Sequence, residues 1–239
     1  MFFGPSRTPA PTDEGAVQFV KNPAVLFTFH RFYGIIQLID KLEFGGEYIL
    51  KCYYHGSCTP GIMELEARSK LHNTAEKVIY LTDNIPYALF YLWDAEHNGC
   101  SAKHVTGWAK NDTAYYEEQF PDQLKTFYHG VSGYLYCIPD STDIKVVENR
   151  TNMFYCSMNA KVTEVIYIPD VYEELLKYEA DGKLVVLRYN EQSAERQNEL
   201  VDFIAKGIIH AKFYVDNESK KEFMKKRFPK SWEKAEMFR

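Results

Sequence analysis

The sequence predicts an α+β fold, with short strands first and helices last, on three observations. Residues 50–190 alternate short apolar or aromatic runs with turn residues, which is typical of small sheets joined by loops. Residues 191–239 place apolar side chains at helical spacing. Aromatic residues make up 15% of the chain, and so many rings favour half-buried strands and a cleft lined by rings. We therefore expect a folded domain over 50–190 and a C-terminal helical appendage over 191–239.

The strands are predicted from β-branched and aromatic runs that end at turn residues. Residues 77–81 have polar neighbours on both sides, and residues 133–138 alternate until Pro139 stops them. Lys110-Asn111-Asp112 joins two other runs as a hairpin. In chain order, the predicted strands are residues 48–54, 77–81, 103–108, 113–116, 133–138, 153–155 and 162–168.

The helices are predicted from capping residues and from the spacing of apolar side chains. Pro86 fits the first turn of the earliest helix, and Gly99 is a suitable residue to end it. In chain order, the predicted helices run from Asp83 or Asn84 to Gly99, over residues 119–127, from Asp170 to Gly182, from Ser193 past Ile208, and from Asn217 to Pro229.

The last of these helices is basic. The basic run that it begins comprises Lys220-Lys221, Lys225-Lys226-Arg227 and Lys230. A solvated helix face is the ordinary interpretation of such a run, and contact with RNA or with an acidic partner is the alternative.

Composition and charge indicate a globular protein. Apolar residues make up 46% and charged residues 26%, which excludes wholesale disorder, a collagen-like repeat and a disulfide-stapled miniprotein. The net charge is −5, so nucleic acid is possible as a partner but charge does not indicate it. The sequence has no run of about 18 apolar residues and no secretory signal, and we expect no membrane partner and a cytoplasmic location by default.

The five cysteines, Cys52, Cys58, Cys100, Cys137 and Cys156, are an odd number without C-x-x-C spacing. Reduced thiols in a cytosolic protein are the expected state. His97 and His104 flank Cys100, which suggests a metal, but Gly99 interrupts the helix and no fourth ligand is evident. We expect no metal site.

Residues 1–49 differ from the rest, with Pro5, Pro9 and Pro11 near the start. In a bacterial gene, Gly45-Gly46-Glu47 can be encoded by GGAGGTGAA, a ribosome-binding sequence, and Leu50 by a TTG start codon. This segment is therefore either an upstream leader read as protein or a genuine N-terminal extension. The nucleotide sequence distinguishes the two, and the segment is kept out of the fold argument.

Two tyrosines suggest a binding slot. Tyr80 ends a strand, and Tyr91 lies eleven positions later, one helical face into the next element. Their rings can converge into a slot that suits a flat, electron-poor heterocycle. Upstream, His55 at a strand end with Gly56 next to it can bring side-chain and backbone groups to one edge of a ligand.

His55-Gly56-Ser57, followed by Tyr80-x-Thr82-Asp83-Asn84 and by Tyr91 after ten intervening residues, resembles the diphtheria-toxin-like ADP-ribosyltransferase superfamily over residues 50–170. The resemblance implies two small, mostly antiparallel sheets that form a cleft, flanked by helices. It also implies NAD as substrate and cleavage of the nicotinamide–ribose bond, with transfer of ADP-ribose to an acceptor that the sequence does not name. Such cleavage has an oxocarbenium-like transition state.

The resemblance assigns a role to each matching residue. His55 would hold the ribose of NAD, and Tyr80 with Tyr91 would enclose the nicotinamide. Gly56 and Ser57 would add hydrogen bonds nearby. Arg68 lies before the second strand, where a loop could bring it to a ligand phosphate.

The catalytic acid does not match. The family places a Glu at the head of the strand after 133–138, near residues 151–154, and no carboxylate is found there. The candidates are Glu148 just before, Glu164 in the following strand, and the pair Glu117-Glu118. The alternative function is a non-catalytic module that uses the same cleft to bind a nucleotide or a protein.

Each of these residues also has a structural interpretation. His55 could be satisfied by its neighbours, and the two tyrosines could be ordinary core rings. Arg68 and the pair Glu117-Glu118 could simply be solvated, and Tyr87 is expected to pack rather than bind.

Overall fold

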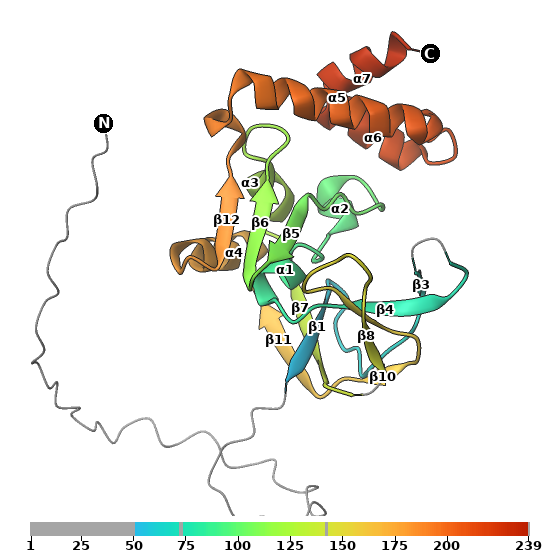
Figure 1. Ribbon diagram of the computed structural model, residues 1–239, viewed down its shortest axis with the longest axis vertical. Helices are drawn as coiled ribbons and strands as arrows, with labels where there is room; N and C mark the ends of the chain where they lie inside the picture. Colours follow the sequence, from blue (N-terminus) through green and yellow to red (C-terminus); the bar gives the residue numbers. More distant parts are fainter. Residues whose placement is uncertain (1–50, 72–73, 142, 239) are drawn as a thin grey trace, which may run out of the picture. The chain divides into compact units, whose positions relative to one another are not determined.

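The computed structural model describes residues 51–71, 74–141 and 143–238, and these form a mixed α+β unit (Figure 1). The coarse fold prediction is confirmed, because several antiparallel sheets are combined with helices. Residues 1–49, and with them the choice between leader and extension, lie outside the described residues, as does the start of the predicted strand 48–54.

The described strands are β1 (Cys52–Ser57), β2 (Glu64–Leu65), β3 (Ser69–Lys70), β4 (Lys77–Leu81), β5 (Gly107–Lys110), β6 (Thr113–Glu117), β7 (Gly133–Pro139), β8 (Ile144–Val146), β9 (Phe154–Cys156), β10 (Ala160–Lys161), β11 (Glu164–Ile168) and β12 (Leu184–Leu187). The described helices are α1 (Ile85–Leu89), α2 (Ala95–Asn98), α3 (Gln123–Tyr128), α4 (Val171–Ala180), α5 (Ala194–His210), α6 (Glu218–Arg227) and α7 (Pro229–Glu236), with the short 3₁₀ turns η1 (Tyr189–Glu191) and η2 (Lys212–Tyr214).

Two of the sheets meet at β1. The order β1-β7-β11 forms one antiparallel sheet, and β3-β4-β9-β8 forms another. A single bridge joins them: the Tyr54 N–H donates to the Thr82 carbonyl at 2.7 Å, and the Thr82 N–H donates back at 3.0 Å. Beyond this bridge the facing edges of β1 and β4 are not paired in the described residues, and residues of both edges line the pocket described below.

A third sheet has the strand order β12-β6-β5. Strands β5 and β6 form the predicted hairpin, and its turn residues Asn111 and Asp112 both have positive φ, at 50° and 63°. Asn and Asp tolerate that conformation, which a tight hairpin turn requires. Strand β12 adds in parallel to β6 and is absent from the sequence prediction.

The predicted helix up to Gly99 is in fact two short helices. Asn84 caps α1 by accepting the Tyr87 N–H at 2.9 Å, and Gly99 ends α2 in the left-handed conformation, as expected. Between them the chain turns, with the Trp93 N–H bonded to the Tyr91 carbonyl at 2.9 Å. The turn lets the apolar residues 88–93, most of them buried, contact the core from several sides, which one helical face could not do.

The C-terminal helices share the main core. Ile204, Phe223 and Trp232 belong to the same buried cluster as Phe90 of the strand–helix unit and Tyr116 of β6. Figure 1 shows α5, α6 and α7 gathered next to one another at one end of the described residues. The described residues therefore form one compact unit, and the predicted appendage packs into its core.

The cysteine prediction is wrong for two residues. Cys52 and Cys137 form a disulfide with 5.8 Å between their Cα atoms. In the β1–β7 register Tyr54 lies opposite Cys137. Cys52 is two residues from Tyr54 on the same strand face, so it is a diagonal neighbour of Cys137. Cys58, Cys100 and Cys156 are free thiols.

The residues considered as metal ligands point to different partners. The ring of His97 contacts the Thr126 carbonyl, that of His104 contacts Gln119, and the Cys100 thiol donates to the Ala102 carbonyl. Among the described helices, none combines the length and apolar character needed to cross a membrane.

Candidate ligand pocket

A pocket of about 210 Å³ opens where β1, β4 and α1 meet. It is smaller than the roughly 300–1,000 Å³ of sites that enclose a whole drug-sized ligand, so it can take one part of a larger molecule. The pocket is lined by Tyr54, His55, Gly56, Ser69, Tyr80, Leu81, Thr82, Tyr87, Tyr91, Lys103 and Met153. The prediction that His55, Tyr80 and Tyr91 share one concave site is confirmed.

The Tyr91 ring is held from two sides. Its hydroxyl lies 3.1 Å from the Tyr87 hydroxyl, and the two rings meet edge to face with centroids 5.5 Å apart. The Lys103 ammonium lies 5.8 Å from the Tyr91 ring centroid and donates to the Tyr91 carbonyl at 2.9 Å. Tyr91 is therefore a preorganised wall of the pocket.

Tyr80 forms another wall. Its hydroxyl donates to the Lys70 carbonyl of β3 at 3.1 Å, which fixes the ring direction. Among the ring contacts of the described residues, Tyr91 pairs with Tyr87 and not with Tyr80. The rings of Tyr80 and Tyr91 therefore do not contact each other. A slot for a flat ligand requires such a gap between its two walls.

His55 presents a hydrogen-bond acceptor. Its Nδ1 lies 3.0 Å from the Tyr80 carbonyl, and a carbonyl only accepts, so Nδ1 carries the proton and donates. Burial lowers the pKa of His55, and the Lys103 charge lowers it further, against the bond to Tyr80. The ring is therefore neutral near pH 7, and Nε2 keeps a lone pair.

Gly56 supplies backbone groups at close range. A Cβ at this position would lie 2.5 Å from the Ala88 carbonyl oxygen, so only glycine lets α1 approach β1 this closely. Backbone groups two residues apart face the same edge of a strand, and those of Tyr54 face Thr82. The N–H and carbonyl of Gly56 therefore face the same unpaired edge, where they offer a donor beside an acceptor.

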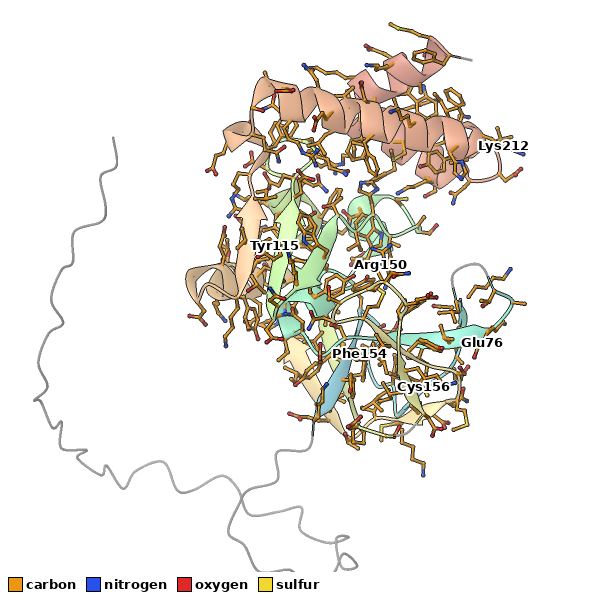
Figure 2. The ribbon with its side chains drawn as sticks, viewed as in Figure 1. Glu76, Tyr115, Arg150, Phe154, Cys156 and Lys212 are labelled. Atoms are coloured by element: carbon orange, nitrogen blue, oxygen red, sulfur yellow. A yellow bond between two sulfur atoms is a disulfide. The ribbon has the colours of Figure 1, made fainter. Side chains whose placement is uncertain are left out.

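Two cations act on the Tyr91 side of the pocket. Burial lowers the pKa of Lys103, which is part of the lining. Arg150, labelled in Figure 2 in the loop between β8 and β9, lowers the pKa of Tyr87 and Tyr91 by its charge, although burial raises both overall. Two cations therefore favour an anionic group near the Tyr91 side of the pocket.

Ser57 and Arg68 are not brought to the pocket. The Ser57 hydroxyl accepts the Thr59 N–H at 3.2 Å and is not part of the lining. Arg68 pairs with Glu66 at 2.8 Å, and its side chain is 77% exposed. Its neighbour Ser69 lines the pocket instead.

None of the candidate acids lines the pocket either. Glu148 is exposed in the loop between β8 and β9. Glu164 is exposed at the start of β11, opposite Cys137 in β7. Its carboxylate lies within 4.8 Å of the sulfurs of Cys52 and Cys137, but the disulfide engages both sulfurs and leaves no thiolate to hold a metal.

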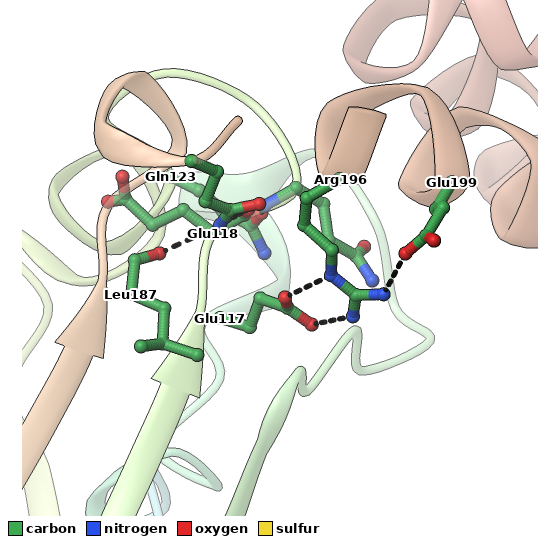
Figure 3. A network of polar contacts seen from close by, with 8 residues as sticks. Glu117, Glu118, Gln123, Leu187, Arg196 and Glu199 are labelled. Carbon is green, nitrogen blue, oxygen red and sulfur yellow. Dashed lines mark hydrogen bonds and ion pairs between the residues drawn. The ribbon is translucent and has the colours of Figure 1, made fainter. Parts of the chain in front are cut away.

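The pair Glu117-Glu118 has structural roles, which Figure 3 shows. Arg196 of α5 donates two hydrogen bonds to Glu117, at 2.9 and 2.8 Å. Glu118 is only 3% exposed and accepts the backbone N–H groups of Leu124 and Tyr189, each at 3.1 Å. The expectation of a solvated pair is wrong for Glu118, because two backbone donors satisfy its buried carboxylate.

The sequence analysis missed several lining residues. Met153 falls inside the stretch 151–154, where the resemblance places a Glu. The resemblance therefore pointed to this stretch, but it did not predict that an apolar side chain from it would line the pocket. Lys103 follows Tyr91 by twelve residues in a loop, and no local pattern marks it. Tyr87 both packs and lines, since its ring supports Tyr91 and also faces the pocket.

No protein-family model, curated protein or solved structure matches this chain.

Proposed function

We propose that the pocket binds the nicotinamide–ribose part of NAD, or the same part of a closely related nucleotide. The observation that carries this proposal is the convergence of His55, Gly56, Tyr80 and Tyr91, four residues named from a sequence resemblance, on one small pocket. These residues come from two strands and a helix turn and meet at the same place, which supports the proposal.

Each group has a natural partner in such a ligand. A flat heterocycle stacks on the Tyr91 and Tyr80 walls. A carboxamide pairs its oxygen with the Gly56 N–H and its amide N–H with the Gly56 carbonyl. A ribose hydroxyl donates to His55 Nε2, and the phosphates extend toward Lys103 and Arg150.

The lining favours binding over ADP-ribosyl transfer. Breaking the nicotinamide–ribose bond builds positive charge on the ribose, and enzymes stabilise such charge with a carboxylate. In the described residues no carboxylate lines the pocket, and Lys103 has the opposite sign. The proposed function is therefore that of an NAD-binding module with an ADP-ribosyltransferase-like fold and without the acid that transfer needs.

Calorimetric titration of the whole chain with NAD, nicotinamide and ADP-ribose tests the proposal. We expect NAD to bind and Tyr91→Ala to weaken it about three- to tenfold, through loss of one stacking wall. His55→Ala should cost about as much again. Tyr167→Ala, an exposed tyrosine on β11 outside the pocket, is the matched control and should bind as wild type does.

A parallel assay for free nicotinamide separates the two functions. We expect no release by the wild-type chain during hours with NAD. Release that depends on His55 and Tyr91 would overturn the binding-only conclusion and support transfer or hydrolysis. Absence of NAD, nicotinamide and ADP-ribose binding would overturn the nucleotide proposal as a whole.

A further inference from the structure

The basic run near the C-terminus divides into two groups in the structure. Lys221 pairs with Glu218 at 2.9 Å, and Lys225 pairs with Glu222 at 2.8 Å, so acids on the same helix compensate these charges. Lys220 is buried against Phe223. The remaining cations, Lys226, Arg227 and Lys230, have no ion pair with any described residue.

These three uncompensated cations share one hollow. It has a volume of about 400 Å³ at the junction of α6 and α7, and Lys226, Arg227 and Lys230 all line it. No carboxylate of the described part of the chain is in its lining. Cations in the last turn of α6 favour the dipole of that helix, but this accounts for Lys226 and Arg227 only.

The N-terminus of α7 opens into the same hollow. Pro229 occupies the first turn, and no side chain caps the helix. The Trp232 N–H bonds to the Phe228 carbonyl, whereas the N–H groups of Lys230 and Ser231 have no acceptor among the described residues. Free N–H groups at a helix start carry a partial positive charge and bind anions.

Ser231 is an independent sign of a ligand. Its side chain lines the hollow, although the residue is only 2% exposed. Its hydroxyl makes no hydrogen bond to any described residue, and it is not one of the fully buried polar atoms that lack a partner, so it is open to the hollow. An oxyanion in the hollow would accept from this hydroxyl and from the two free N–H groups together.

Aromatic side chains complete the lining. Phe120, Tyr189 and Phe228 lie around the cations, and the Arg227 guanidinium is 6.0 Å from the centroid of the Phe120 ring. Cations that neutralise phosphate beside rings that stack on bases are the combination with which proteins hold nucleotides and single strands.

We propose that the hollow at the α6–α7 junction binds the phosphate group of a nucleotide, either free or within a single strand. Ser231 and the start of α7 hold the phosphate oxygens, Lys226, Arg227 and Lys230 neutralise it, and the rings contact the base. The site shares no lining residue with the pocket around Tyr91, so it does not depend on the function proposed for that pocket.

Binding is tested with the full chain carrying Tyr91→Ala, which weakens nucleotide binding at the other pocket. The probes are inorganic phosphate, AMP and a ten-nucleotide single strand of mixed sequence, each at low and at physiological salt. We expect AMP to bind, and to bind more weakly as salt rises. Equal affinity for AMP and for the strand indicates a free nucleotide as the ligand, and tighter binding of the strand indicates nucleic acid.

Variants assign the binding to this hollow. Lys230→Ala should weaken AMP binding about tenfold, and Ser231→Ala, which keeps the size of the buried side chain, about three- to tenfold. Lys221→Ala removes a paired cation of α6 outside the hollow and should leave the affinity unchanged. Failure of all three probes to bind at low salt would overturn the proposal, as would equal losses in Lys230→Ala and Lys221→Ala.

Discussion

At the scale of single residues, His104 is a buried titratable group with a hydrogen-bond partner at each ring nitrogen. A lysine ammonium only donates, so His104 Nδ1 accepts from Lys220 at 3.3 Å, and Nε2–H donates to the Gln119 side-chain oxygen at 2.9 Å. Phe127, Phe223 and Phe228 surround the ring. Burial lowers the pKa of His104 to about 4, and the Lys220 charge adds to the effect.

This lowered pKa predicts acid sensitivity. Between its ordinary pKa of about 6.5 and about 4, His104 is protonated in the unfolded chain but not in the folded one, so stability falls as pH falls through this window. The loss attributable to this group is on the order of 3 kcal/mol at the acid end. Urea unfolding at pH 7.5 and pH 4.5 should show a loss in the wild type that is smaller in His104→Gln by about that amount. Equal losses in both proteins would contradict the assignment.

Met153 stands where the resemblance places the missing acid. Met153→Glu should restore a carboxylate to the pocket beside His55 and Tyr91. If the pocket holds NAD as proposed, this variant should release nicotinamide about 10²–10³-fold faster than the uncatalysed background seen with the wild type, the scale of one electrostatic group aimed at developing charge. Met153→Gln, with the same shape and no charge, is the control. Release no faster from the Glu variant than from the Gln variant would mean that position 153 does not face the ribose.

The parts of the site that the sequence predicted are those with local patterns. Four of the lining residues lie near strand ends or in a capped turn: His55, Gly56, Tyr80 and Tyr91. Such positions are determined by neighbouring residues in the sequence, so they could be predicted from it. Ser57 and Arg68 were predicted from similar local patterns, but neither lines the pocket. Ser57 instead bonds to Thr59, and Arg68 pairs with Glu66. Lys103 and Met153 reach the pocket from loops, and only the tertiary fold determines where a loop residue lies.

At the scale of elements, the contact between β1 and α1 decides whether the pocket exists. Gly56→Ala would place a Cβ 2.5 Å from the Ala88 carbonyl oxygen, and a backbone atom cannot move aside cheaply. We expect a loss of about 1–3 kcal/mol in the free energy of unfolding, together with weaker NAD binding.

Gly207→Ala is the matched control for Gly56→Ala. Gly207 lies inside α5, and an added Cβ there meets nothing within 4 Å. It should stabilise the chain by about 0.5–1 kcal/mol, because alanine loses less entropy in a helix. Chemical denaturation measures both variants, and an unchanged stability of Gly56→Ala would show that α1 is not held closely against β1.

Element boundaries could be predicted from the sequence where a single local feature, such as a capping residue or a turn sequence, determines them. Strand β4, the cap at Asp170 and the hairpin turn were predicted correctly, and of the two predicted caps, Asp83 or Asn84, it is Asn84 that begins the helix. The two-residue strands β2, β3 and β10 are too short to show any period. Strand β12 has four apolar residues, but its pairing with β6 spans a long stretch of chain that no local pattern encodes.

At the scale of the whole molecule, the shared core predicts one cooperative transition. Trp232 of α7 is 7% exposed and packs edge-on against Phe213, while Phe223 of α6 meets Trp93 of the first half. The helices of 191–239 are therefore not an independent unit, and separate melting of this segment would leave the core of β5 and β6 exposed to water.

Trp232→Ala tests this coupling. Removing a buried tryptophan costs about 3–5 kcal/mol, and because the core is shared, that loss should lower the stability of the entire described unit rather than of α7 alone. Far-ultraviolet circular dichroism and tyrosine fluorescence should report the same shifted urea midpoint, with one transition each. Trp108→Ala, at a position 38% exposed on β5, is the control and should shift the midpoint much less. Two separated transitions in Trp232→Ala, with β-sheet signal retained after helical signal is lost, would show that 191–239 unfolds on its own and that the core is divided.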